Sequence, residues 1–209
     1  FTVGSAEGDS EAVAIDAAGQ GLWIGGLGGL ALISGASGEA RPVALDGIDL
    51  QQATPEVTSV LSRRDGSLWL GLRGHGAVRR VTGEPGFAPL AFATRGRETP
   101  AVNRLAETPR GDIVAATDRG LHLFDAACDC FRPARSASPL RQSLDGALML
   151  GAVGDGDIIW AGSWNRGLFR FDPQAPDFDL LTPTDLGGRD APVVPRSLFV
   201  DRQQRLWVG

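Results

Sequence analysis

A short apolar phrase that contains tryptophan and glycine recurs along this chain at a nearly constant interval. Its clearest copy is Leu68–Leu72 (LWLGL), which stands between the turn Asp65-Gly66 and a second turn rich in glycine. Counted from Trp23, the equivalent positions follow after 46, 45, 46 and 47 residues, and the last copy ends at Gly209. A fixed period of this length in a chain of short strands is typical of the blades of a β-propeller.

Each repeat contains four apolar stretches separated by turn residues, which predicts a meander of four antiparallel strands. The second stretch is apolar at nearly every position, as expected for a strand covered on both faces. We therefore predict an all-β fold, a β-propeller of four-stranded antiparallel blades with about four and a half blades present. The expected blades cover 13–48, 57–94, 102–135 and 147–183, with a partial blade at 193–209 and residues 1–4 as the outer strand of a preceding blade.

The two ends of the chain predict that these 209 residues form one segment of a larger ring, because the chain would open on a fourth strand and stop after a second one. The formal charge of −5 gives no electrostatic footprint for nucleic acid. No apolar run approaches the roughly 20 residues that span a bilayer. Membrane attachment is therefore expected only through segments outside this chain.

The tryptophan and the glycine two residues later share one face of their strand, since side chains alternate with period two. The glycine can make room for a bulky group from the neighbouring blade. In the third copy Val114 replaces tryptophan and Ala116 replaces glycine, so that volume lost at one position is partly regained at the other. We predict that the tryptophans of the other copies are core residues between adjacent sheets: Trp23, Trp69, Trp160 and Trp207.

The repeated phrase resembles the two-component regulator propeller repeat. It stands as DGSLWLGLRGHGAV in the second copy, as DIIWAGSWNRGLFRFD in the fourth and as DRQQRLWVG in the fifth. The resemblance covers nearly the whole chain. The third copy departs from the pattern at Val114, and the fifth carries Gln204 where a turn glycine is expected.

Propellers of that family usually form the extracytoplasmic input region of membrane-bound bacterial signalling proteins, whose output is a histidine kinase, a hybrid regulator or a diguanylate cyclase. The resemblance therefore implies a periplasmic, non-catalytic module without cofactor or metal. Its partner would be a small molecule, a glycan fragment or another domain. A homodimer of the full-length protein is left open.

A different class of function is a propeller enzyme such as a polysaccharide lyase or glycosidase. A cluster of carboxylates or histidines over the central channel would favour it. The sequence contains no sialidase-type Asp-box, no Gly-x-Ser-x-Gly elbow, no phosphate loop and no histidine-rich metal spacing. A lectin would need a similar site in every blade, and the unequal turns argue against one.

Two kinds of residue at the turns have simple interpretations. Aspartates recur with the blades and are predicted to be turn-formers whose side chains bond their own backbone: Asp65, Asp125, Asp172 and Asp201. Cys128 and Cys130 allow half a metal site, a strained bridge or two ordinary thiols. We favour ordinary thiols, because the two histidines of the chain lie in other elements.

The turn after the second strand breaks the symmetry of the repeats, and function usually lies on such loops above a rigid scaffold. Trp164 occupies a place that is small or polar in most copies. Its indole suits stacking on a sugar ring or anchoring a partner. We predict a ligand site there that also draws on the neighbouring turns, made of Trp164, Asn165, Arg166, Asp118, Arg119, Arg73 and His75. The simpler alternative is that these turns are merely solvated.

Overall fold

The structure is a computed structural model, which describes residues 10–19, 21–48, 55–94, 99–134, 144, 146–175, 178–182, 184–185 and 194–209. The chain divides into two compact units, Phe1–Ala91 and Phe92–Gly209, and each is described by itself. The strand predicted for residues 1–4 lies outside the described residues, as do most of the connections between blades. In the described part of the chain, no helix combines the length and the apolar character needed to cross a bilayer.

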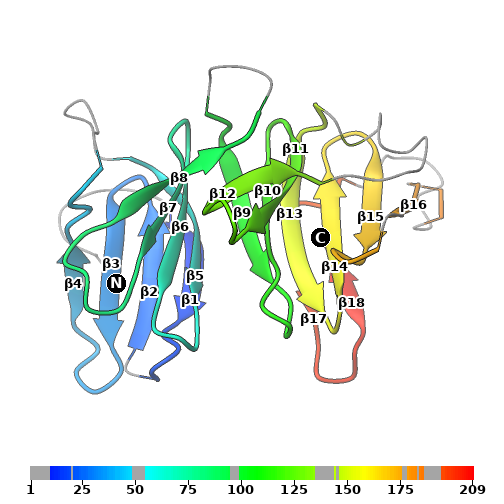
Figure 1. The fold of residues 1–209 in the computed structure, drawn as a ribbon. Helices are drawn as coiled ribbons and strands as arrows, with labels where there is room; N and C mark the ends of the chain where they lie inside the picture. Colours follow the sequence, from blue (N-terminus) through cyan, green and yellow to red (C-terminus); the bar gives the residue numbers. More distant parts are fainter. Residues whose placement is uncertain are drawn as a thin grey trace. The chain divides into compact units, whose positions relative to one another are not determined.

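Blades 1 and 2 are antiparallel meanders whose strands pair in chain order (Figure 1). Blade 1 consists of β1 (Ser10–Ile15), β2 (Gly21–Gly26), β3 (Gly29–Ser34) and β4 (Ala40–Val43). Blade 2 consists of β5 (Val57–Ser62), β6 (Leu68–Leu72), β7 (Gly76–Arg80) and β8 (Ala88–Phe92), and the first unit ends within β8. Within the first unit, β1 and β2 both contact β5, so the two sheets pack face against face.

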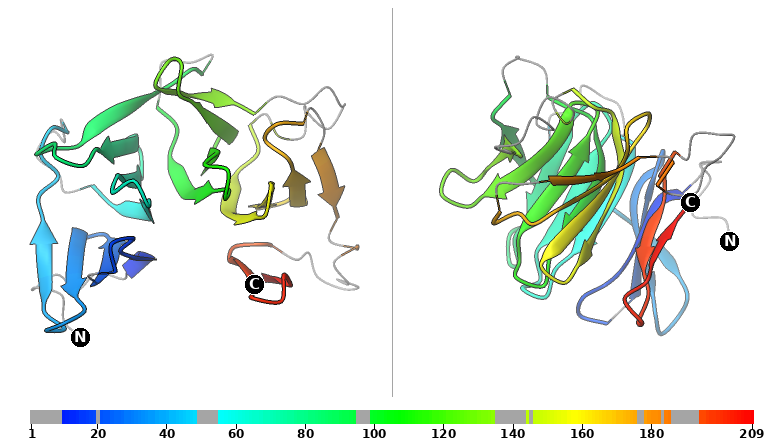
Figure 2. Two further views of the ribbon diagram at one scale, coloured as in Figure 1. Left: turned by 60° about the horizontal axis from the view of Figure 1, so that its bottom comes forward. Right: turned by 90° about the vertical axis from the view of Figure 1, so that its right-hand side faces the viewer.

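The second unit repeats this arrangement in blades 3 and 4 and begins it again in blade 5. Blade 3 consists of β9 (Val102–Glu107), β10 (Ile113–Thr117), β11 (Gly120–Asp125) and β12 (Cys130–Pro133). Blade 4 consists of β13 (Met149–Asp155), β14 (Ile158–Ser163), β15 (Gly167–Phe171) and β16 (Phe178–Leu181). The paired strands β17 (Leu198–Val200) and β18 (Leu206–Val208) belong to blade 5 and are drawn in red beside blade 4 in Figure 2. The predicted all-β fold, a partial propeller of four-stranded blades, is confirmed.

Glycine makes room for the neighbouring blade as the sequence predicts. A Cβ added at Gly25 of β2 would lie 2.5 Å from Val57 Cγ1 in blade 2. A Cβ at Gly162 of β14 would collide with the carbonyl oxygen of Pro195, just before blade 5. In blade 3, Ala116 is fully buried in one core cluster with Met149 of blade 4. The second strand of each blade thus lies close to the start of the next blade, and this close contact limits the size of the side chain at the glycine position.

Three of the four tryptophans predicted to be core are buried at least in part. Trp69 is 1% exposed, Trp23 is 6% exposed and Trp160 is partly buried. The prediction is wrong for Trp207, which is 56% exposed. Its strand β18 pairs with β17, and among the described residues no further sheet covers that face.

The turns that precede the second strands confirm the role predicted for aspartate. Asp65 Oδ1 accepts the backbone N–H of Ser67 at 2.9 Å, and Asp201 Oδ1 accepts that of Gln203 at 2.9 Å. Asp125 and Asp172 accept backbone N–H groups in the turns after the third strands. Gln204, the residue in place of a turn glycine, has φ = 58°. The backbone thus keeps the conformation that glycine takes in the other copies.

A one-residue irregularity recurs near the start of each complete blade. The pairing register shifts between Ser10 and Ala12, Val57 and Ser59, Val102 and Arg104, and Met149 and Gly151. Such bulges re-aim the adjoining side chains and are common next to functional sites. They lie at the end of the blade that carries the turn between the second and third strands, which we call the upper end.

Candidate functional site

One backbone hydrogen bond holds the upper turn in the same way in three blades. The first residue of the turn donates its N–H to the carbonyl oxygen just ahead of the first strand of its own blade. These bonds are Arg73 to Glu56 at 3.0 Å, Asp118 to Ala101 at 3.1 Å and Trp164 to Leu148 at 2.9 Å. A repeated backbone frame therefore presents a different side chain at one equivalent place in each blade.

Trp164 is presented to solvent at this place in blade 4, with 45% of its surface exposed. The guanidinium carbon of Arg196 lies 4.9 Å from the centroid of its ring, which is the geometry of a cation–π contact. Asn165 is exposed and Arg166 half-buried in the same turn. The structure thus brings Trp164 together with Arg196, a residue that the sequence argument missed because it lies in the connection to blade 5.

The two residues predicted from blade 3 differ in what they offer. The carboxylate of Asp118 accepts the backbone N–H of Ala101 at 2.9 Å, so it stabilises the entry to its own blade. Arg119 is half-buried, and its backbone N–H donates to Thr117 Oγ1 at 3.1 Å. Asp118 is therefore a structural residue of the turn, whereas the side chain of Arg119 remains a candidate for ligand contact.

The two residues predicted from blade 2 belong to the first unit. The guanidinium of Arg73 forms an ion pair with the carboxylate of Glu56, and His75 is exposed at the tip of the turn. Arg73 therefore has a partner within its own blade. A contribution of Arg73 and His75 to the site at Trp164 stays a prediction.

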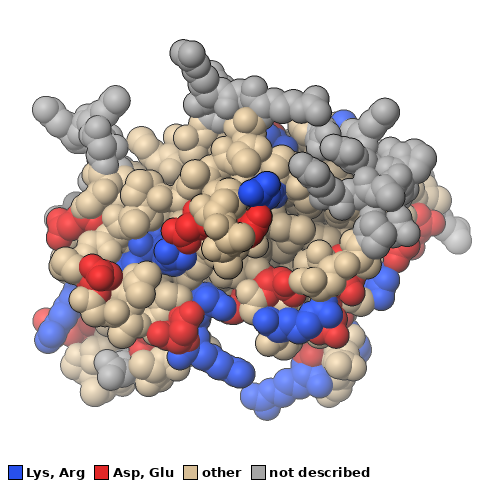
Figure 3. All heavy atoms as spheres, in the orientation of Figure 1, with Lys and Arg blue, Asp and Glu red and all other residues tan. Residues whose placement is uncertain are grey.

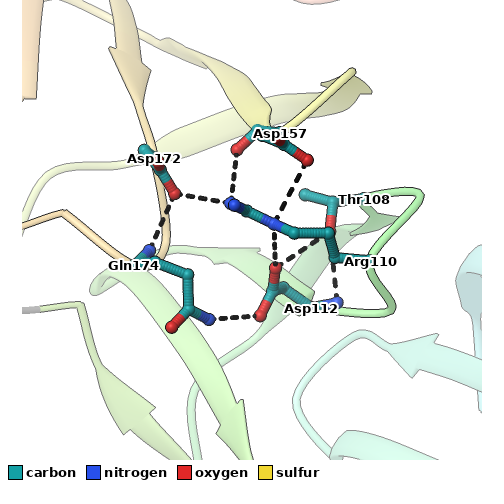
Figure 4. Close-up of polar contacts among 6 residues, drawn as sticks. All are labelled: Thr108, Arg110, Asp112, Asp157, Asp172 and Gln174. Carbon is teal, nitrogen blue, oxygen red and sulfur yellow. Dashed lines mark hydrogen bonds and ion pairs between the residues drawn. The ribbon is translucent and has the colours of Figure 1, made fainter.

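A second polar group joins blades 3 and 4 at the opposite, lower end (Figure 4). Arg110 lies among carboxylates of three different turns, at 3.5 Å from Asp112, 3.2 Å from Asp157 and 2.7 Å from Asp172. Gln174 connects the same turns by donating to Asp112 Oδ1 at 2.7 Å. Ion pairs thus connect blades 3 and 4 at their lower ends.

One cation, Arg110, is shared by the three carboxylates of this lower group. Desolvation opposes the charge of Arg110, but the hydrogen bond to Asp172 and the surrounding carboxylates raise its pKa overall. The backbone N–H of Gln174, and then Arg110, hold the pKa of Asp172 below its usual value. Among the described residues, no group of His, Cys, Asp and Glu side chains is placed to hold a metal ion.

The cysteines form a disulfide, so the interpretation as two ordinary thiols is wrong. Cys128 and Cys130 are bonded to each other across the turn between β11 and β12, with Cα atoms 5.2 Å apart. Asp129 between them has φ = 51°, which brings the two side chains to one side of the turn. Of the three interpretations of these cysteines, the bridge is the correct one.

Described acidic and basic side chains are interspersed over the face drawn in Figure 3. Selectivity for a charged ligand must therefore come from individual side chains, not from a field of one sign. The strongest candidate for a ligand site is therefore the upper end of blade 4, where an exposed aromatic ring and a cation, Trp164 and Arg196, lie together.

The fold is that of several solved propellers. The extracellular domain of BT4673 from B. thetaiotaomicron, described as a one-component or hybrid two-component system, superposes with a TM-score of 0.76 at 18% identity. That alignment covers 96% of this chain and 26% of the other. The extracellular domain of the hybrid two-component system BT3049 from the same organism gives a TM-score of 0.73 at 19% identity, with 96% and 25% covered. This chain thus spans about a quarter of the length of these extracellular domains.

An enzyme shares the fold as well. Virginiamycin B lyase from Staphylococcus aureus superposes with a TM-score of 0.72 at 14% identity, covering all of this chain and 65% of the lyase. No protein family in the sequence scan matches the chain, and no curated protein matches its sequence. At these identities the comparisons establish the fold.

Proposed function

We propose that this chain is a segment of the extracytoplasmic input propeller of a bacterial signalling protein, and that it binds its ligand or partner domain without catalysing a reaction. The observation that carries the proposal is the exposed indole of Trp164 on a backbone frame that is otherwise repeated from blade to blade. The likeness to extracellular domains of two-component systems supports the same class of function. Function on a shared fold must still be argued from the site.

The chemistry of the site suits recognition. The indole offers a flat apolar surface with one N–H donor, and Arg196 already covers part of it with a cation. Asn165 and Arg166 in the same turn add hydrogen-bond donors. An anionic or polyhydroxylated ligand would therefore meet an aromatic surface and several donors at one place. The ligand would be a sugar acid, a glycan fragment or a polar surface of a partner domain.

A propeller lyase or glycosidase is the competing function, and the likeness to virginiamycin B lyase supports it. Such an enzyme needs an acid or base within reach of its substrate. His122 is only 2% exposed, and Asp118 bonds the backbone of its own loop. Within the second unit, where Trp164 lies, these two placements favour binding over chemistry at the upper end.

The proposal is tested by thermal shift of this chain against a panel of periplasmic sugars, sugar acids and glycan fragments. Trp164→Ala should abolish the stabilisation by a true ligand, and Arg119→Ala should reduce it. Trp207→Ala removes an exposed tryptophan from another surface and serves as the matched control. A ligand that stabilises both site variants as well as the wild type would place the site elsewhere.

A further inference from the structure

Blade 3 differs from the other complete blades at one position of its first strand. Arg104 of β9 is paired with Ala116 of β10. The corresponding residues of the other blades are all small: Ala12 opposite Gly25, Ser59 opposite Gly71 and Gly151 opposite Gly162. A long cationic side chain therefore stands where the repeat otherwise has little or no side chain.

The side chain of Arg104 lies on the face of blade 3 that is turned toward blade 4. Residues paired across two strands share a face of the sheet, so Arg104 is on the side of Ala116, which packs with Met149. The neighbouring Asn103 donates from Nδ2 to the carbonyl oxygen of Met149 at 2.7 Å. The upper ends of β9 and β13 are thus in contact beside Arg104.

The Arg104 guanidinium has lost much of its hydration without gaining a partner among the residues that the structure describes. Burial removes water from the guanidinium and thereby lowers its pKa. Among the described residues, none donates to it, accepts from it or forms an ion pair with it. A desolvated cation without a counter-charge is unfavourable, and such a group is a candidate for binding an anion from solution.

A second polar group in the same interface also lacks a partner. Ser163 is fully buried at the upper end of β14, and its hydroxyl makes no hydrogen bond within the described structure. Gly162 faces Pro195 on the side of blade 5, so the next residue, Ser163, faces blade 3. Ser163 is paired with Met149, the residue whose carbonyl oxygen receives Asn103.

We propose that the upper end of the interface between blades 3 and 4 binds a carboxylate group, with Arg104 as its ion-pair partner and the Ser163 hydroxyl as a further donor. A carboxylate matches the planar fork of a guanidinium in both shape and charge. One cation favours a group with a single negative charge over a phosphate dianion. Small organic acids and sugar acids both carry this group.

The assignment deepens the proposed function by giving the sensed ligand a carboxylate, and it rests on residues other than Trp164 and Arg119. Acetate serves as the probe for small organic acids. Glucuronate serves for sugar acids, with uncharged glucose as its counterpart. The melting temperature of this chain is measured in each of them at constant ionic strength, with chloride as the reference anion.

We expect acetate or glucuronate to raise the melting temperature, and glucose to leave it unchanged. Arg104→Gln should weaken carboxylate binding at least tenfold, and Ser163→Ala should weaken it several-fold. Without carboxylate, Arg104→Gln should be at least as stable as the wild type, because it removes an uncompensated charge. Arg41→Gln, at an exposed arginine of blade 1 paired with Glu39, is the matched control and should bind like the wild type.

Three results would overturn the assignment. They are equal binding by Arg104→Gln and the wild type, no stabilisation of the wild type by either carboxylate, or a loss of stability in Arg104→Gln without ligand. A ligand that requires Trp164 while Arg104→Gln binds it normally would contradict this inference and leave the proposed function standing. Carboxylate binding that is unchanged in Trp164→Ala but lost in Arg104→Gln would support this inference and contradict the site proposed at Trp164.

Discussion

The indole N–H of Trp207 donates to Asp201 Oδ2 at 2.9 Å, across the turn that joins β17 to β18. Equivalent bonds run from Trp23 to Asp16 at 3.0 Å and from Trp160 to Asp155 at 3.2 Å. In blade 2, Trp69 donates to Ser67, which in turn donates to Asp65 at 2.6 Å. The turn aspartate therefore binds the tryptophan of its own blade directly in blades 1, 4 and 5, and through Ser67 in blade 2.

Asp201 should titrate well below an ordinary aspartate. Backbone N–H of Arg205, then the Trp207 indole and further donors, lower its pKa from 3.8 to about 2. Because the folded-state pKa is below the unfolded one, the stabilisation is complete above about pH 4 and is lost as the pH falls toward 2. The Trp207 indole resonance, followed by NMR, should shift with a midpoint near 2.

In Asp201→Asn that titration of the Trp207 indole resonance should disappear. A midpoint for Trp207 at the ordinary value of 3.8 would contradict the hydrogen-bond set described for Asp201.

Trp69 and Trp207 should differ strongly in their contribution to stability. Trp69→Ala removes a side chain that is 1% exposed and is expected to lower the free energy of unfolding by about 3–5 kcal/mol. Trp207→Ala removes one that is 56% exposed and should cost clearly less, because it deletes little buried apolar surface and mainly the hydrogen bond to Asp201. Urea denaturation of the two variants measures the difference. Equal losses would mean that burial within the blades does not govern their effect.

Gln204→Gly should stabilise the hairpin of β17 and β18. A non-glycine residue at φ = 58° carries a steric cost of about 1 kcal/mol, which glycine avoids. Amide hydrogen exchange of the two strands should slow by about fivefold for each 1 kcal/mol gained. The adjacent Gln203→Gly, at a residue without positive φ, should bring no such gain. Faster exchange in Gln204→Gly would show that the glutamine side chain stabilises the turn.

The disulfide should contribute little to the stability of blade 3. It closes a loop of only three residues, for which the entropy of the unfolded chain predicts about 1.5 kcal/mol. The turn is also held by Asp125, which accepts the N–H of Ala127 at 2.9 Å and pairs with Arg132 at 2.8 Å. Replacing both cysteines by serine should therefore leave a cooperative transition in urea at a slightly lower midpoint. Unfolding of the chain upon this double replacement would contradict the expected small role.

The repeat could be predicted because it follows from packing within and between neighbouring blades. Trp69 and its glycine pack within and against neighbouring sheets, and Ala116 regains part of the volume that Val114 loses. The exposure of Trp207 could not be predicted from its own strand, because burial also depends on a covering sheet. The same holds for Arg196, whose contact with Trp164 depends on the course of a connection that carries no repeated pattern.

The sequence also does not show which polar and charged side chains have a partner. Arg73 and Asp118 look like free polar groups of a turn, but both are paired inside their own blades. Arg104 looks like an ordinary strand residue, and only the packing of blade 4 against it shows that no described residue pairs with its guanidinium. Bonding of a polar side chain depends on three-dimensional neighbours that residue type and spacing do not specify.

The bond between turn aspartate and indole makes the two positions epistatic. Losing the tryptophan frees a carboxylate, and losing the aspartate leaves an N–H without its acceptor, so each single step is penalised by the other residue. The third repeat has lost both partners: Val114 stands for tryptophan, and Thr108 holds the first turn position that Asp16 and Asp201 occupy elsewhere. Thr108 instead bonds Asp112 at 3.0 Å within its turn. Recombination that exchanges whole turns with their strands should therefore be tolerated better between these repeats than exchange of the single residues.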